Sequence, residues 1–213
     1  MAGGMLTKQA DFLTAKFLND VNDAAAGGVI VSVPSGAPSP AVSQTIPGDR
    51  IVLDDATALA LSDTTIGTLY GGIYMYVGAT WTTQAARLGG IAFWLAANLT
   101  NGTYTVNGDA QPTTAIPTYI AGIFINTLTK GNFGWIQIAG LATVLFDGAL
   151  TAAAAGNWVS AKVSASAGTA STADNGAVAG VVTLAAMLGV AVGLPATSAA
   201  STVLITRSPF GRV

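Results

Sequence analysis

Residues 131–148 read GNFGWIQIAGLATVLFDG, and they carry the clearest β-strand signals in this sequence. Aromatic and β-branched side chains dominate Gly134–Ile138 and Thr143–Phe146, which predicts two strands. The Asp147-Gly148 pair that follows is typical of a tight turn between antiparallel strands. Short strands joined by glycine turns are therefore the expected pattern of this region.

The same pattern continues on both sides of this stretch, from Gly48 to the C-terminus. Runs of strand composition, bounded by Gly, Asn or Asp, are Ile51–Leu53, Leu69–Val77, Ile91–Leu95, Gly102–Val106, Tyr119–Ile125, Trp158–Val163, Val178–Leu184, Gly189–Leu194 and Thr202–Thr206. Asn-Gly pairs at 101–102 and 107–108 predict hairpins, and the stretches 80–90 and 164–176 have loop composition. About ten short strands at regular spacing predict an all-β fold, either a barrel or a sandwich.

The N-terminal stretch has a different pattern. Apolar residues recur every three or four positions at Leu6, Ala10, Leu13, Phe17 and Val21. This spacing predicts one amphipathic helix from Leu6 to Ala26, which the following pair of glycines ends. A short amphipathic helix is marginal alone, so its apolar stripe needs a surface to dock on.

A linker follows this helix. Val29–Val33 is a short β-branched run, and residues 34–40 read PSGAPSP. Three prolines so close together exclude a helix or a central strand and favour an extended chain. The chain therefore divides into an N-terminal helix and extended Pro-rich arm, residues 1–47, and a β-rich domain, residues 48–213.

The composition argues against catalysis and against metal or cofactor binding. The chain has no Cys and no His, and all ten acidic residues are Asp. The usual general base near neutral pH, the commonest metal ligands and any thiol nucleophile are therefore missing. We predict that the protein is not an enzyme and uses no cofactor.

Charge is scarce, at 8% of residues, and 51% of residues are hydrophobic. A monomer with so few charges is poorly protected against association, so either partner subunits cover its surface or it lies in a membrane. Residues 177–194 are long and apolar enough to span a bilayer, but their glycines and the following Pro195 favour two buried strands. The net charge is −2 and the basic residues are scattered singly, so the sequence has no positively charged cluster that would bind nucleic acid. The N-terminus lacks a secretory signal pattern, so we expect synthesis in the cytoplasm.

A few side chains are candidates for metal binding, catalysis or sugar binding. Asp54-Asp55, with Asp49 and Asp63 nearby, is the one acidic cluster of the β-rich part, and we interpret it as turn residues instead of a calcium site. Ser160 and Lys162 form at most a solvent-facing pair. We expect the four tryptophans to lie in the core or at a subunit interface instead of in a glycan-binding groove. They are Trp81, Trp94, Trp135 and Trp158.

The segments Gly122–Ile125, Gly131–Gly140, Ala142–Gly148, Leu188–Leu194 and Ser201–Thr206 together resemble bacteriophage capsid decoration (cement) proteins. The order of parts is similar: a Gly-aromatic-x-Gln strand, a glycine turn, and a closing pair of small apolar strands. The resemblance implies a β-barrel or tulip-like domain, often trimeric, that clamps junctions on the outer surface of the capsid. It also implies a structural virion protein that stabilises contacts between major capsid protein subunits.

From this resemblance we expect two partners, the major capsid protein and the chain itself in a homotrimer, with no nucleic acid and no membrane. The predicted capsid or subunit contacts lie in the arm and the C-terminal tail, and they are Leu6, Phe12, Phe17, Val31, Phe210 and Arg212. Two alternatives stay open. The chain is either another virion part, such as a tail or fibre subunit, or a glycan-binding β domain that uses its tryptophans.

Overall fold

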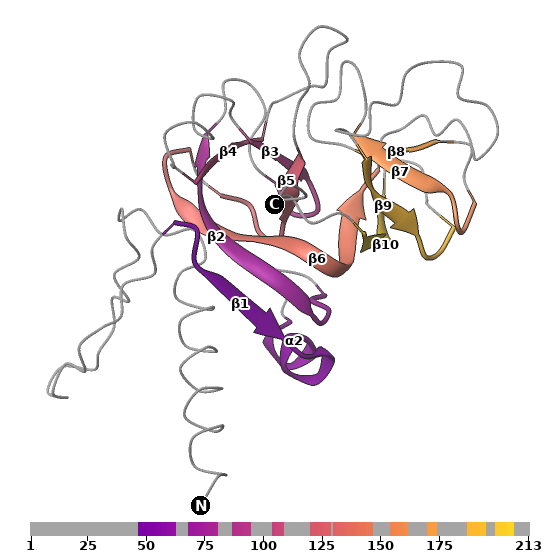
Figure 1. Ribbon diagram of the computed structural model, residues 1–213, viewed down its shortest axis with the longest axis horizontal. Coiled ribbons are helices and arrows are strands. Elements are labelled where there is room, and N and C mark those ends of the chain that lie inside the picture. Colours follow the sequence, from indigo (N-terminus) through magenta and orange to yellow (C-terminus); the bar gives the residue numbers. More distant parts are fainter. Residues whose placement is uncertain are drawn as a thin grey trace, which may run out of the picture.

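The computed structural model describes residues 47–62, 68–80, 87–94, 104–108, 120–128, 130–146, 154–161, 170–173, 187–194 and 199–206 (Figure 1). Within them the chain forms ten strands and one helix. The elements are β1 (Arg50–Leu53), α2 (Asp55–Leu61), β2 (Gly72–Thr80), β3 (Ile91–Trp94), β4 (Thr105–Asn107), β5 (Ile120–Phe124), β6 (Phe133–Leu145), β7 (Trp158–Ala161), β8 (Ala170–Ala173), β9 (Met187–Ala191) and β10 (Ala200–Ile205).

Five of the strands close into a barrel in the order β2-β4-β3-β5-β6, and β6 pairs back with β2. The β2–β4 pair is parallel and the other neighbouring pairs are antiparallel. Because the barrel is closed, backbone N–H and C=O groups that would be unpaired at a sheet edge find partners within the barrel. The predicted all-β fold is confirmed, and of the two expected architectures these strands form the barrel.

A second group of strands continues from the far half of β6. Residues Gly140–Leu145 pair with β10, and β9, β7 and β8 follow in that order, all antiparallel. Figure 1 shows β6 running below the barrel and then turning up beside β10. We call the four strands β7–β10, with the far half of β6, the second sheet. At the other end of the fold, β1 pairs with the first half of β2 and leads into α2.

The turn of β6 from the barrel into the second sheet depends on glycine. Gly140 has a φ of 98°, a conformation that costs an L side chain energy. A Cβ at this position would overlap the carbonyl oxygen of Gly71 and would lie 2.9 Å from Cα of Gly72. The buried side chain of Gln137 donates hydrogen bonds to the carbonyl oxygens of Ala139 and Leu141 on either side of the bend. The bend is therefore fixed by close backbone contact and by one buried amide.

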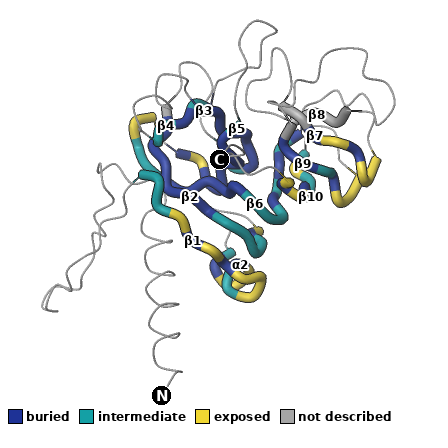
Figure 2. The backbone as a smooth tube through the Cα atoms, viewed as in Figure 1, coloured by how far each residue is buried: buried dark blue, intermediate teal, exposed yellow. Residues whose placement is uncertain are grey.

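Three clusters of buried side chains hold these elements together. Figure 2 marks the buried residues in dark blue along the strands of the barrel. All five barrel strands contribute to the barrel core, which includes Met75, Val106 and Ile136. Because side chains alternate along a strand, the barrel strands also bury residues on their outer face. On β2 and β6 that outer face packs against β1 and α2 through Tyr74 and Trp135.

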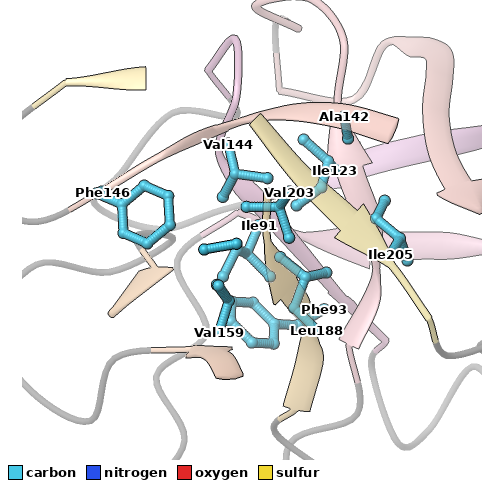
Figure 3. Close-up of a cluster of buried hydrophobic side chains, with 11 residues drawn as sticks. Ile91, Phe93, Ile123, Ala142, Val144, Phe146, Val159, Leu188, Val203 and Ile205 are labelled. Atoms are coloured by element: carbon cyan, nitrogen blue, oxygen red, sulfur yellow. The ribbon is translucent and has the colours of Figure 1, made fainter. Parts of the chain in front are cut away.

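The remaining cluster, the inter-sheet core, lies between the outer wall of the barrel and the second sheet. Its residues come from β3 and β5 on one side and from β6, β7, β9 and β10 on the other. Figure 3 shows these side chains meeting, and they include Ile91, Phe93, Ile123, Val144, Val159, Leu188 and Val203. The two groups of strands therefore share one apolar interface.

Several sequence predictions were wrong in detail. Residues 133–145 form one bent strand instead of two, because Gly140 redirects the backbone without ending the pairing. Residues 55–61 form a helix where turn residues were expected, because the Asp54 side chain caps it. Residues 170–173 pair with β7 inside a stretch expected to be a loop. Asn107 does not open a tight hairpin, since the next described strand, β5, pairs with β3 and not with β4.

Other predictions fall wholly or partly outside the described residues. The helix Leu6–Ala26 and the Pro-rich arm lie there, so the division at residue 47 stays a prediction. Of the apolar stretch 177–194, the described part contains strand β9. In the ranges given above, no helix is long and apolar enough to cross a membrane.

The bend at Gly140 gives a stability prediction. Gly140→Ala should destabilise the protein by about 3 kcal/mol, because it combines an unfavourable φ with a clash against backbone that cannot move aside. Gly131→Ala is the matched control, since Gly131 also has a positive φ, 84°, but a Cβ there has open space. That variant should lose only about 1 kcal/mol. Urea unfolding measures both, and equal losses would contradict the role of the close approach.

Candidate functional site

None of the six predicted contact residues lies in the described part of the chain. Leu6, Phe12, Phe17 and Val31 precede residue 47, and Phe210 and Arg212 follow residue 206. They stay predictions. Ser160 and Lys162 are likewise not tested, because their side chains are outside the described set. The candidate site must be sought on the surface of the described domain.

The acidic pair Asp54-Asp55 has a structural role. Asp54 is the N-cap of α2, and its two carboxylate oxygens accept hydrogen bonds from the backbone nitrogen of Thr57 at 2.8 Å and its hydroxyl at 3.0 Å. These bonds lower the pKa of Asp54 below its usual value. Asp55 accepts from the backbone nitrogen of Gly71 at 2.8 Å and so fixes the helix to the start of β2. No group of three or more His, Cys, Asp or Glu side chains gathers in the described ranges.

The lowered pKa of Asp54 predicts a pH-dependent contribution to stability. A carboxylate whose pKa is lower in the folded state stabilises that state at neutral pH, and the effect fades as the pH falls through the folded pKa. Asp54→Ala should therefore lower the melting temperature at pH 7 and have a smaller effect near pH 2.5. Asp54→Asn keeps an N-cap acceptor and should stay close to wild type at pH 7. Melting curves at the two pH values test this, and an Asp54→Ala effect that does not change with pH would contradict it.

Two of the tryptophans are core residues, as the sequence predicted. Trp135 is buried and its ring meets Tyr76 edge-on with centroids 5.4 Å apart. Trp94 is buried in the barrel core and meets Tyr104 in a similar way at 6.1 Å. Trp81 lies outside the described residues. Trp158 differs from these, because 42% of its surface is exposed although it stands in the middle of a paired sheet.

Trp158 belongs to a row of apolar side chains that crosses the second sheet. The pairing register places Leu141 opposite Leu204, Leu204 opposite Val190, and Val190 opposite Trp158. Residues directly opposite each other in neighbouring strands project from the same face of the sheet. Their neighbours Val159 and Val203 point the other way, into the inter-sheet core. The row therefore lies on the face of the second sheet that points away from the barrel.

Val192, the residue that follows β9, extends this row. Its backbone nitrogen donates to the carbonyl oxygen of Thr202, two residues before Leu204, so Val192 shares the face with Val190. We call the surface formed by Leu141, Trp158, Val190, Val192 and Leu204 the apolar face. Val192 is 52% exposed and Leu204 is 42% exposed. Leu194, just beyond β9, is 71% exposed.

The described segments that form the apolar face contain no charged residue. No Asp, Lys or Arg occurs in residues 140–146, 154–161, 187–194 or 199–206. Residues 68–70 lie beside the apolar face, where Thr143 of β6 donates to the carbonyl oxygen of Thr68 and the hydroxyls of Tyr70 and Thr202 of β10 lie 3.5 Å apart. Exposed apolar side chains gathered on one uncharged sheet face are typical of a protein–protein contact. The low charge of the chain indicated that some of its surface is covered by partners. The pairing register is needed to show that these residues form one such surface.

The buried phenol of Tyr74 also has a structural role. Tyr74 is buried in the cluster beneath α2, and its hydroxyl donates to the carbonyl oxygen of Tyr70. Burial raises the pKa of Tyr74 well above its usual value, so the phenol stays protonated. A proton donor held in this way anchors the chain before β2.

Comparisons with known proteins give one partial likeness. No protein-family model matches the chain, and no curated protein matches it. Among solved structures, the chain is similar to the N base of the head fibre protein gp8.5 of bacteriophage phi29. The likeness has a TM-score of 0.40 and 16% sequence identity, and it covers 63% of this chain and 94% of the other. At these values it supports no statement about function.

Proposed function

We propose that this chain is a structural protein of a phage virion, which binds the outer surface of the capsid and stabilises contacts between major capsid protein subunits. The observation that carries the proposal is the composition of the chain, in which only 8% of residues are charged and 51% are hydrophobic. A protein of this composition binds its partners by burying apolar area, at about 25 cal/mol per Å² before the costs of association. It requires no titrating group.

The described fold suits that role. A closed barrel and a second sheet share an apolar core, and the barrel strands bury side chains on both of their faces. The contacts to the capsid or to a neighbouring subunit are assigned to the arm and the tail, at Leu6, Phe12, Phe17, Val31, Phe210 and Arg212. Self-association into a homotrimer is part of the same proposal, because a trimer presents several arms to neighbouring capsid subunits and gains avidity.

Two other functions remain as alternatives, and each has a distinguishing observation. A tail or fibre subunit would be found in the virion but away from the shell. A glycan-binding domain would use exposed aromatic rings with polar groups beside them. Of the described tryptophans only Trp158 is exposed, and its pairing partners in the two neighbouring strands are Val190 and Ala173. These aliphatic partners favour a protein partner over a sugar.

Sedimentation with purified capsids that lack this protein tests the proposal. The full chain should co-sediment to saturation at a fixed ratio to the major capsid protein. Because the contact is mainly apolar, its affinity should change less than about tenfold between 50 and 500 mM NaCl. Deletion of residues 1–33 should abolish binding while the β domain keeps its thermal transition.

Two outcomes would overturn this proposal. One is a truncated chain that still saturates the capsids, which would show that the arm is not part of the contact. The other is a full chain that never sediments with them, although it is found in purified virions, which would favour a tail or fibre subunit.

A further inference from the structure

Two features of this chain each call for a covering surface. The apolar face is a register-matched surface of Leu, Val and Trp side chains, on described strands that contain no charged residue. The sequence of residues 6–26 predicts a helix with one apolar stripe, which is marginal in water until it docks. The apolar face and the predicted helix belong to the same chain, so any assembly contains one helix for each face.

We propose that residues 6–26 of this chain cover the apolar face, with the stripe Leu6, Ala10, Leu13, Phe17 and Val21 against the sheet. This inference does not depend on the proposed function, because it concerns a contact between two parts of the same polypeptide. The helix comes either from the same molecule or from a neighbouring copy, and the surface contact is the same in both cases.

The dimensions of the two surfaces agree. Residues Leu6 and Val21 are fifteen positions apart, which corresponds to about 22 Å along a helix. The four strands from β6 to β7 span three interstrand spacings, or about 14 Å, and β8 adds about 5 Å. A helix crossing the sheet would therefore meet every strand of the apolar face.

The linker is long enough for this contact. Residues 27–46 separate the helix from the first described residue, and twenty extended residues reach at most about 70 Å. A tether of this kind raises the effective concentration of the helix at the face, so a modest contact area suffices.

The helix fits the face better than a second copy of the sheet would. If two apolar faces packed on each other, the stripe of residues 6–26 would still need another cover. Docking the helix on the face satisfies both at once. Phe12 lies about 140° from the centre of the stripe, so docking leaves it free for the capsid contact proposed above.

Disulfide trapping tests the contact directly, because the natural chain has no Cys. Val192→Cys is combined with Leu13→Cys in the full-length protein and oxidised with copper–phenanthroline. The pair should form a disulfide at least tenfold faster than the control pair Val192→Cys with Ala15→Cys. Residue 15 is close to residue 13 in sequence but lies about 200° round the helix.

The gel pattern then identifies the source of the helix. A disulfide within one chain and a disulfide between two chains both support the proposal, and they assign the helix to the same molecule or to a neighbour. Equal rates for the two cysteine pairs would overturn it.

A charge placed on the face gives a second test that needs no cross-link. Val192→Asp should release the helix, so the helical circular dichroism signal should fall to that of a chain lacking residues 1–26. Val52→Asp is the control, because Val52 is 71% exposed on β1, away from the apolar face, and should keep the signal. Both variants should keep the cooperative unfolding of the β domain. A Val192→Asp protein with the full helical signal would overturn the proposal.

Discussion

Strand β6 belongs to two sheets, and it can do so because its backbone passes close to that of residues 71–72 at Gly140. The positive φ of Gly140 turns the strand, and the missing Cβ lets it lie against Gly71 and Gly72. Before the bend, β6 closes the barrel with β2 and β5. After it, the same strand carries β10 and the rest of the second sheet.

The bend also sets where the apolar face can be. Beyond Gly140, alternate residues of β6 point into the inter-sheet core, as Val144 does, or away from the barrel, as Leu141 does. The same alternation continues through β10, β9 and β7, because antiparallel neighbours keep their faces in register. One buried side and one exposed apolar side of the second sheet therefore follow from a single turn of the backbone. Gln137 supports that turn by satisfying two carbonyl groups inside it.

The sequence predicted the class of fold and most of the strands, since strand composition and glycine turns are local signals. It did not reveal that residues 133–145 form one strand, because a glycine within a β-rich run looks the same whether it ends a strand or bends it. The helix α2 was missed because seven residues are too few for a clear apolar period, although Asp54 is a common N-cap residue. The strand Ala170–Ala173 has a composition of Ala, Ser and Thr, and its pairing with β7 is a tertiary effect.

The candidate site was less predictable than the fold. The apolar face is made by residues that are far apart in the chain, from Leu141 to Leu204, and only the pairing register brings them into one row. Composition could indicate that some surface is covered, but not which one. The acidic pair was interpreted from its spacing as turn residues, while its role in capping α2 and in holding Gly71 needed coordinates.

The position of β6 in the chain has a consequence for biosynthesis. Strands β2, β3, β4 and β5 leave the ribosome first, yet the ring cannot close until β6 supplies pairs to both β2 and β5. The second sheet is completed later still, when the C-terminal β10 adds to the far half of β6. Most stabilising contacts thus join segments distant in sequence, a topology that folds slowly and late in translation. Until then the apolar strands of the nascent chain stay uncovered, so chaperones have a long interval in which to bind them.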